Sequence, residues 1–315
     1  MVYETFLKTI HAMVQERLQG RAKVSLQQVL KNNGLLLDGL TIAPAESCMA
    51  PTVYLNAYYE EAEKGLPLSI ITDQIVLLYE TDPGIPEETA KEVQQFESVR
   101  DKIAYKLIHA GENKTLLATI PHIRYLDLAI IFYFIVAENE DGQMTALIRR
   151  EHLKLWGITE EDVIQLAEKN TPRLLPAKIT PIEQALANLD TFSLLPQEDL
   201  PPVHLKVLTN NREINGAACI LYPNLLKNLA DDAEDDLIII PSSIHEVLVA
   251  PQRHALPYQE LNAMIRHINQ TDVPPEDRLA DHVYCYSRSQ SCLYLPSLPF
   301  HRPYSSASGE TENPQ

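Results

Sequence analysis

Apolar side chains follow helical spacing at the start of the chain and strand spacing soon after it. Residues 1–18 carry apolar side chains at steps of three and four, which predicts an amphipathic helix. Residues 22–30 and 35–43 flank Lys-Asn-Asn-Gly at 31–34, and Asn and Gly tolerate the positive φ angles of tight turns, so we expect a β-hairpin. The next predicted elements are a strand at 52–55 and a helix at 68–79.

The middle of the chain is predicted to hold the longest helix and the most apolar strand. Residues 87–109 begin with glutamates and end with Lys106 and His109, the charge order that the helix dipole favours. Residues 126–137 form a near-continuous apolar run rich in β-branched and aromatic side chains, which favours a strand buried on both faces. We expect it to form a second hairpin with residues 144–155.

A cluster of prolines marks the predicted boundary between two halves of the chain. Thr159 and Asp162 have the spacing of a helix-start cap, and we expect the helix that follows to end before Pro172. Six prolines then fall between Thr171 and Pro202, around a short helical candidate at 182–189. The predicted parts are an N-terminal α+β domain at 1–171, a proline-rich linker at 172–202, a C-terminal α+β domain at 203–290 and a disordered tail at 291–315.

The second half alternates short strands with two helices. The expected strands are 204–208, 216–221, 237–240, 247–250 and 282–287, and the expected helices are 224–230 and 258–268. Strands that follow one another in this way favour antiparallel or mixed sheets with helices packed on one face. The predicted fold class is therefore α+β rather than a doubly wound parallel sheet.

Charge and cysteine content narrow the classes of partner and compartment. The net charge is −17, from 26 Lys and Arg against 43 Asp and Glu, and no basic cluster stands out that could neutralise phosphates. We therefore expect no nucleic-acid partner. The four cysteines lie far apart with no C-x-x-C pair, which disfavours a zinc site and a disulfide scaffold and favours reduced thiols in the cytoplasm.

No stretch of the sequence is typical of export or membrane anchoring. The N-terminal segment has charged residues between its apolar ones, unlike a signal peptide. The longest uncharged apolar run, residues 128–137, falls short of the roughly 18–20 residues that a membrane span needs. We expect a cytoplasmic protein that does not associate with a membrane.

Residues 236–251 hold the densest group of reactive side chains, between two apolar runs. Ser242, Ser243, His245 and Glu246 include a nucleophile, a base and a carboxylate, as a hydrolase site requires. However, neighbouring strand residues point to opposite faces, and no glycine-flanked elbow exposes either serine. Ser243 and Glu246 also have capping-box spacing, so the favoured interpretation is a structural turn, with anion or carbonyl binding by the same donors as a third option.

The remaining polar features give no prediction of a metal or cofactor. The ten histidines include no H-E-x-x-H, the acidic run at 231–236 lacks the glycine and alternation of a calcium loop, and no glycine-rich phosphate loop occurs. Arg124 and Asp127 lie at the start of the apolar strand, where they could form a charged pair, and both are candidate ligand or partner contacts. Tyr54 and Tyr58 are candidate ligand or partner contacts, although core packing is the more frequent explanation for such a spacing.

Several segments resemble a bacterial domain-of-unknown-function family, number 5688. They are 29–34 (VLKNNG), 51–55 (PTVYL), 121–127 (PHIRYLD), 170–176 (NTPRLLP), 216–223 (GAACILYP) and 241–246 (PSSIHE). Members are common in Gram-positive gut bacteria, sometimes on integrative mobile elements. The resemblance covers roughly residues 1–290 and implies a bacterial cytoplasmic location and a fold that spans both halves, but no assigned activity, ligand or catalytic residue.

Together these patterns predict a non-enzymatic binding or regulatory protein in the cytoplasm. Its partner is expected to be a protein or a small molecule, and a mobile-element setting is a subsidiary hypothesis. The alternative is a hydrolase that uses Ser243 or Ser242 with His245. No cofactor is predicted for either function.

Overall fold

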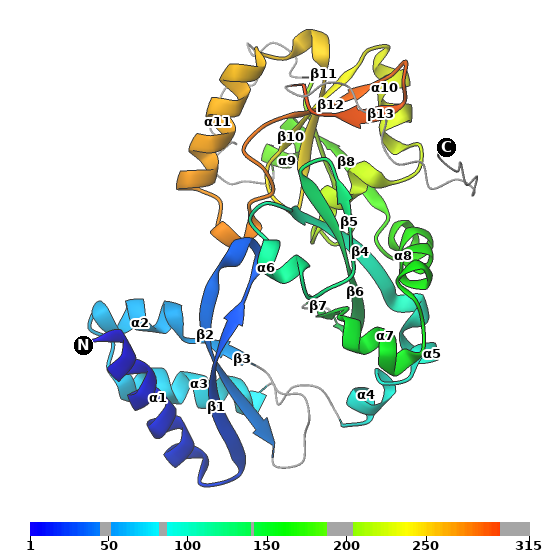
Figure 1. The fold of residues 1–315 in the computed structure, drawn as a ribbon. Coiled ribbons are helices and arrows are strands. Elements are labelled where there is room, and N and C mark those ends of the chain that lie inside the picture. The colour runs from blue at the N-terminus through cyan, green and yellow to red at the C-terminus, as the bar shows by residue number, and fades with distance from the viewer. Residues whose placement is uncertain (45–51, 82–86, 140–141, 188–203, 297–315) are drawn as a thin grey trace, which may run out of the picture. The chain divides into compact units, whose positions relative to one another are not determined.

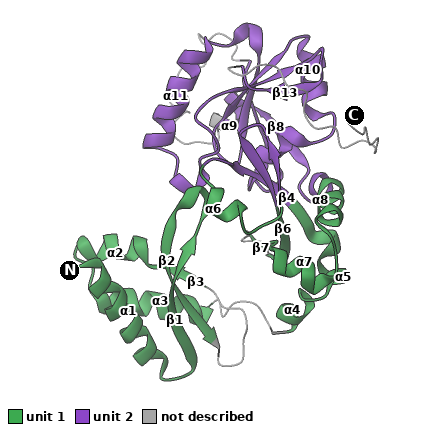
Figure 2. Ribbon diagram, viewed as in Figure 1, with its two compact units in different colours: residues 1–104, 112–121, 132–170 green, residues 105–111, 122–131, 171–315 purple. Residues whose placement is uncertain are grey.

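The structure is a computed structural model that describes residues 1–44, 52–81, 87–139, 142–187 and 204–296. Its fold is α+β, as predicted, and the strand pairings that define its sheets are antiparallel (Figure 1). The chain divides into two compact units (Figure 2). Unit 1 comprises residues 1–104, 112–121 and 132–170, and unit 2 comprises residues 105–111, 122–131 and 171–315.

The first 81 residues form a module with its own core inside unit 1. It contains α1 (Tyr3–Leu18), β1 (Ala22–Leu30), β2 (Leu36–Pro44), β3 (Thr52–Tyr54), α2 (Leu55–Glu63) and α3 (Leu68–Thr81). The sheet order is β1-β2-β3, and the predicted hairpin is confirmed, with Leu30 opposite Leu36 and a left-handed Asn33 in the turn. Fully buried Phe6 and Ile10 of α1 and Ile75 of α3 anchor the core, which the regular spacing of apolar residues explains.

Three short helices and a four-stranded sheet follow the module. The helices are α4 (Glu87–Glu92), α5 (Phe96–Val99) and α6 (Lys114–Leu117), and the strands are β4 (Ile103–His109), β5 (His122–Tyr125), β6 (Leu128–Asn139) and β7 (Gly142–Leu147). The sheet order is β4-β6-β5, with β7 paired to β6. The predicted apolar strand is confirmed as β6, in which residues 128–136 are buried except for Ile130.

Two helices complete the middle of the chain, α7 (Arg150–Trp156) and α8 (Glu160–Leu174). The predicted cap of α8 is confirmed. The Asp162 carboxylate accepts the Thr159 backbone N–H at 2.8 Å, and the Thr159 hydroxyl oxygen accepts the Asp162 N–H at 3.1 Å. The helix continues through Pro172 to Leu174, so the predicted end before this proline is wrong. Pro172 has no backbone N–H to donate to the carbonyl of Glu168, so the last turn of α8 forms without that hydrogen bond.

Unit 2 is built on a six-stranded sheet of order β13-β12-β10-β11-β9-β8. Its strands are β8 (Ala177–Pro181), β9 (Lys206–Asn210), β10 (Leu237–Pro241), β11 (Val247–Pro251), β12 (Tyr284–Ser287) and β13 (Cys292–Tyr294), and its helices are α9 (Ile182–Ala187), α10 (Leu225–Ala233) and α11 (Tyr258–Thr271). Leu261 and Ile265 of α11 pack on Ile238 of β10 and Cys285 of β12, a core that fixes this helix on the sheet.

Three predicted secondary-structure assignments are wrong. Residues 103–109 form strand β4 instead of the end of a long helix, and residues 216–221 form a 3₁₀-helix, η4, instead of a strand. Both segments are buried nearly all round, which removes the periodicity that separates helix from strand. The predicted strand at 144–155 is interrupted, because β7 ends at Leu147 and α7 begins at Arg150.

Parts of the predicted domain scheme also differ from the structure. Residues 177–181 of the predicted linker are strand β8, which pairs with β9 from Ala177 opposite Asn210 to Pro181 opposite Lys206. Residues 292–294 of the predicted tail are strand β13, paired with β12. Prolines and short strands can coexist at the edge of a sheet, which is where β8 and β13 lie. Residues 188–203 and 297–315 lie outside the described residues.

Candidate functional site

The loop that joins β10 to β11 holds the four side chains predicted as a reactive cluster. The strands pair up to Pro241 opposite Val247, which leaves residues 242–246 as the connection. Ser243 Oγ accepts the backbone N–H of His245 at 3.0 Å, and the Ser242 hydroxyl donates to Glu246 Oε1 at 3.2 Å. The Ser243 backbone N–H donates to the Glu246 carbonyl at 3.2 Å. The serines and the glutamate therefore close the loop on itself.

Both ring nitrogens of His245 have partners outside the loop. Nδ1 accepts the backbone N–H of Asn215 at 3.2 Å, and Nε2 lies 3.2 Å from Asp277 Oδ1. The acceptor role of Nδ1 assigns the proton of the neutral ring to Nε2, which donates it to the carboxylate. A serine hydrolase needs one imidazole nitrogen to accept the serine proton. Here the nitrogen that would do so is occupied by a backbone N–H.

Close packing beneath His245 joins this loop to β9 and η4. The Thr209 hydroxyl donates to the His245 carbonyl at 2.7 Å. A Cβ on Gly216 would lie 2.1 Å from Thr209 Oγ1 and 2.5 Å from that carbonyl, so only glycine fits at this position. The Ala217 backbone N–H donates to the carbonyl of Ile244 at 3.2 Å. The bonds of the loop are those of a structural turn.

Asp127 contacts three residues from two other segments of unit 2. Its Oδ1 accepts the hydroxyl of Tyr284, which is fully buried, at 2.9 Å. Its Oδ2 lies 3.2 Å from Nε2 of His282 and 3.6 Å from Nε2 of His109. The His282 nitrogen is buried and falls outside hydrogen-bond geometry, so its contact with Asp127 is electrostatic. The expected pairing with Arg124 does not form, and Arg124 is exposed on β5.

The surroundings of Asp127 favour its charged form. Burial raises the pKa of this carboxyl, but the His282 contact and the hydrogen bond from Tyr284 outweigh burial, so the pKa lies below its usual value. Burial and the neighbouring carboxylate hold the pKa of Tyr284 well above its usual value, so this hydroxyl remains a donor. Gly111 lies close to the same cluster, because a Cβ on it would meet the His109 ring at 2.9 Å.

The two candidate tyrosines lie in the N-terminal module, away from this cluster in sequence. Tyr54 ends β3, and the Lys31 ammonium lies 4.1 Å from the centre of its ring, a cation–π contact. Tyr58 is on α2 and packs against the module core, where burial raises the pKa of its hydroxyl. Both side chains are half-buried, so each has a structural contact that accounts for its position.

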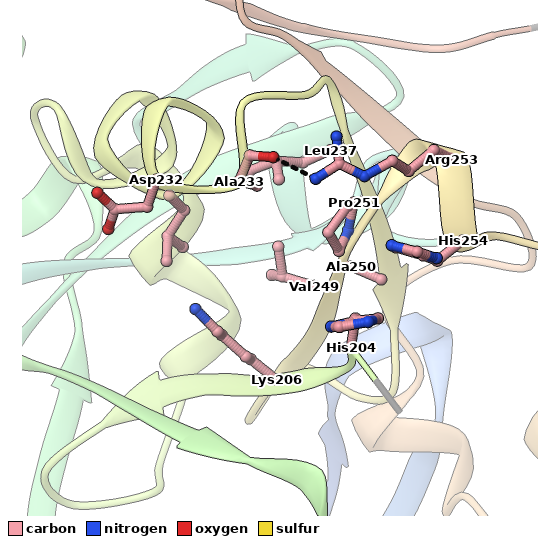
Figure 3. Close-up of a pocket in the computed structure, with 11 residues that line it drawn as sticks. His204, Lys206, Asp232, Ala233, Leu237, Val249, Ala250, Pro251, Arg253 and His254 are labelled. Atoms are coloured by element: carbon pink, nitrogen blue, oxygen red, sulfur yellow. Dashed lines mark hydrogen bonds between the residues drawn. The ribbon is translucent and has the colours of Figure 1, made fainter. Parts of the chain in front are cut away.

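A pocket of about 270 Å³ in unit 2 was not predicted from the sequence. Its apolar wall comes from Leu229 of α10, Leu237 of β10 and Val249 of β11. Four basic or imidazole side chains line it as well: His204, Lys206, Arg253 and His254 (Figure 3). A concave apolar surface with a few converging polar groups is the usual form of a small-molecule site.

Antiparallel pairing explains how the polar wall of the pocket is assembled. Lys206 stands opposite Val249 where β9 pairs with β11, so the start of β9 meets the end of β11. His204 precedes β9, and Arg253 and His254 follow β11 in the 3₁₀-turn η5 (Gln252–His254). In the sequence, His204 and Lys206 lie at the start of one strand, and Arg253 and His254 follow the end of another. Only the order of the strands in the sheet brings the two pairs together.

The imidazole rings and the guanidinium of this wall are held in place. The rings of His204 and His254 stack with their centres 4.3 Å apart and their planes 27° apart. Nη2 of Arg253 donates to the Ala233 carbonyl at 2.6 Å, and its Nε lies 3.9 Å from Asp235 Oδ2. Figure 3 shows these side chains around the open space, with the Lys206 ammonium extended toward it. The polar wall is therefore largely preformed.

The described part of the chain has three buried thiols and no candidate metal centre. There, no three or more His, Cys, Asp or Glu side chains are arranged to hold a metal ion. Cys219, Cys285 and Cys292 are free and buried, and burial raises the pKa of the Cys219 thiol to about 12. Cys48 is outside the described residues. Over the same residues, no helix has the length and apolarity to cross a membrane.

Comparison with known proteins places the sequence in a family. A family model, a family of unknown function (DUF5688), matches residues 3–288. The chain belongs to this family. The match runs through both units and includes the His245 loop, the Asp127 cluster and the pocket of the DUF5688 chain. No curated protein and no solved structure matches the chain.

Proposed function

We propose that this chain is a non-enzymatic binding protein whose ligand is a small molecule held in the pocket formed by β9, β10, β11 and α10. The observation that carries the proposal is the pocket itself, with its apolar wall and its preformed polar wall. Its volume of about 270 Å³ lies just below the range of drug-sized sites, so the ligand is small.

The contacts of the His245 loop support binding over hydrolysis. Asp277 beside His245 resembles the carboxylate that orients a catalytic histidine, which is the feature that favours the alternative. However, the second nitrogen of the ring accepts a backbone N–H, and both serines are bonded within the loop. We also propose a regulatory role in a bacterial cytoplasm, which the family resemblance and the widely separated cysteines favour, and no nucleic-acid partner, which the acidic charge disfavours.

A substitution that fills the pocket tests this function. Ala233 ends α10 and lines the pocket, and leucine is as favourable as most residues in a helix. We expect Ala233→Leu to abolish, or weaken by at least about tenfold, the binding of small molecules that wild-type protein binds in a ligand-observed NMR screen. The screen includes acids, amides and amines of matched size.

The matched control is Ala57→Leu, an equal enlargement on the exposed surface of α2. This variant is expected to bind the same molecules as the wild type. Thermal unfolding of both variants verifies that each is folded. A set of molecules that binds Ala233→Leu as tightly as the wild type, or the absence of any binder, would count against the pocket as the functional site.

A further inference from the structure

We infer that the ligand of this pocket is a small organic anion: an acidic group on an apolar body, with the acidic group held by Lys206. This assignment rests on the proposed function and specifies its ligand class. Three observations support this ligand class: the charges that line the pocket, the protein partners that some of these charges already have, and the shape of the apolar wall.

The pocket presents one uncompensated cation in a strongly acidic protein. The chain carries a net charge of −17, and two cationic side chains, Lys206 and Arg253, line the pocket beside the carboxylate of Asp232. The Asp235 carboxylate lies against Arg253, which leaves the charge of Lys206. In Figure 3 the Asp232 carboxylate points away from the other labelled side chains. A cationic side chain that faces a pocket without a paired carboxylate attracts anions.

Lys206 is the cation that remains available to a ligand. Among the residues that the structure describes, none forms an ion pair or hydrogen bond with its ammonium, and the side chain is exposed. Its position opposite Val249 places the base of the side chain in the pocket wall. An ammonium group in this position can donate hydrogen bonds to a carboxylate, sulfonate or phosphate oxygen.

Arg253 differs from Lys206, because its guanidinium already has partners within the protein. Its guanidinium donates to Ala233 at 2.6 Å and lies near Asp235, and its backbone N–H donates to the same carboxylate at 2.9 Å. These contacts link η5 to the end of α10 and fix one side of the opening. Arg253 is therefore a positioning residue, which leaves the acidic group to Lys206.

The remainder of the pocket fits an apolar and preferably flat body. Leu229, Leu237 and Val249 offer no hydrogen bonds, and the stacked rings of His204 and His254 add a flat edge. Flat apolar groups pack on such surfaces with offset or edge contacts. A neutral polar molecule would leave Lys206 without compensation, and a cation would be repelled by it.

Three probes of nearly the same shape test this inference: 2-naphthoate, 2-naphthamide and 2-naphthylmethylammonium. Each is titrated against the full chain by ligand-observed NMR at low salt. We expect 2-naphthoate to have a dissociation constant at least about tenfold lower than that of the amide, and the ammonium probe to bind more weakly still. High salt is expected to weaken the binding of 2-naphthoate more than that of the amide.

Two lysine variants test whether Lys206 causes the preference for 2-naphthoate. Lys206→Met keeps the length of the side chain and removes its charge, and it is expected to reduce the preference for 2-naphthoate to below about threefold. Lys178→Met is the control, since Lys178 is an exposed lysine on the neighbouring strand β8 and pairs with Glu213 outside the pocket. It is expected to leave the preference unchanged.

The outcomes separate the ligand class from the proposed function. If none of the probes binds wild-type protein at millimolar concentration, the pocket fails as a ligand site. If the amide or the ammonium probe binds as tightly as 2-naphthoate and Ala233→Leu abolishes that binding, the ligand site stands and the anionic class is overturned. A preference for 2-naphthoate that persists in Lys206→Met also overturns the assignment.

Discussion

At the scale of single residues, Asp127 is the ionisable side chain with the most distant set of partners along the chain. It bonds Tyr284, 157 positions away, and contacts His282 and His109. These contacts lower the pKa of Asp127 in the folded protein. A carboxyl whose pKa is lowered by folding stabilises the folded state above its unfolded pKa, and this contribution is lost as the pH falls through the folded pKa.

Asp127→Asn is expected to lower the free energy of unfolding at neutral pH by about 1–3 kcal/mol, because a hydrogen bond to a charged group is lost. The variant is also expected to lose less stability than the wild type when the pH falls below about 4, where the carboxylate becomes protonated. Chemical denaturation across pH 3 to 7 measures both effects. Asp232→Asn, at an exposed position, is the control, and equal acid sensitivity of wild type and Asp127→Asn would contradict the prediction.

Residue types indicated the character of the His245 loop but not its partners. Capping-box spacing and Pro-Ser-Ser chemistry favoured a turn, and the observed bonds of Ser242, Ser243 and Glu246 are those of a turn. The partners of His245, by contrast, come from Asn215 and Asp277, each about 30 positions away. No local pattern specifies such distant contacts, so the sequence left the role of His245 undecided.

At the scale of elements, the start of α8 is defined by two side chains. The reciprocal bonds between Thr159 and Asp162 satisfy backbone N–H groups that the first turn leaves free. Thr159→Ala is expected to lower the free energy of unfolding by about 1 kcal/mol. Thr159→Ser keeps the hydroxyl and is expected to lose much less.

Urea denaturation of the two variants and the wild type measures this difference. Equal losses in Thr159→Ala and Thr159→Ser would show that the methyl group of threonine, rather than its hydroxyl, stabilises the helix start. Asp162 is exposed, so these substitutions change few tertiary contacts, and the difference in unfolding free energy reports on the cap itself.

Elements with one buried face were predicted well, and the long buried strand β6 was too, but the buried segments β4 and η4 were assigned wrongly. The amphipathic pattern of α1 and the alternation of the β1–β2 hairpin each distinguish an inner from an outer face. In β4, Lys106 and His109 are the half-buried side chains among buried neighbours, so nothing in its pattern opposes continuation of a helix. The same is true of η4, whose small residues pack tightly beside Thr209.

At the scale of the whole molecule, residues 1–81 form a part with a core of its own. Its cluster of buried side chains extends from Phe6 to Val76 and is drawn entirely from this module. We expect a fragment of residues 1–81 to fold alone, with lower stability than in the full chain because Asn113 bonds Asn33 in the hairpin turn. Dispersed amide resonances and a cooperative melt would support this prediction, and a collapsed spectrum would contradict it.

The fold class could be predicted from the order of strands and helices, but the division into units could not. Strand pairing within unit 2 joins β10 to β12 across α11, and β11 to β9 across α10 and β10. The residues that line the pocket are brought together by this order, which depends on packing far along the chain. Local sequence patterns therefore could not predict the pocket.

The discontinuity of unit 2 has a consequence for synthesis on the ribosome. Residues 105–111 and 122–131 emerge before residue 171, yet the remainder of their unit follows from that position onward. At about 5–20 residues per second, these apolar segments wait several seconds or more for their partners. Tyr284, the hydroxyl donor to Asp127, is made more than 150 residues after Asp127 itself. Nascent chains stalled before that point should recruit chaperones, and ribosome-bound intermediates should become protease-resistant late and abruptly.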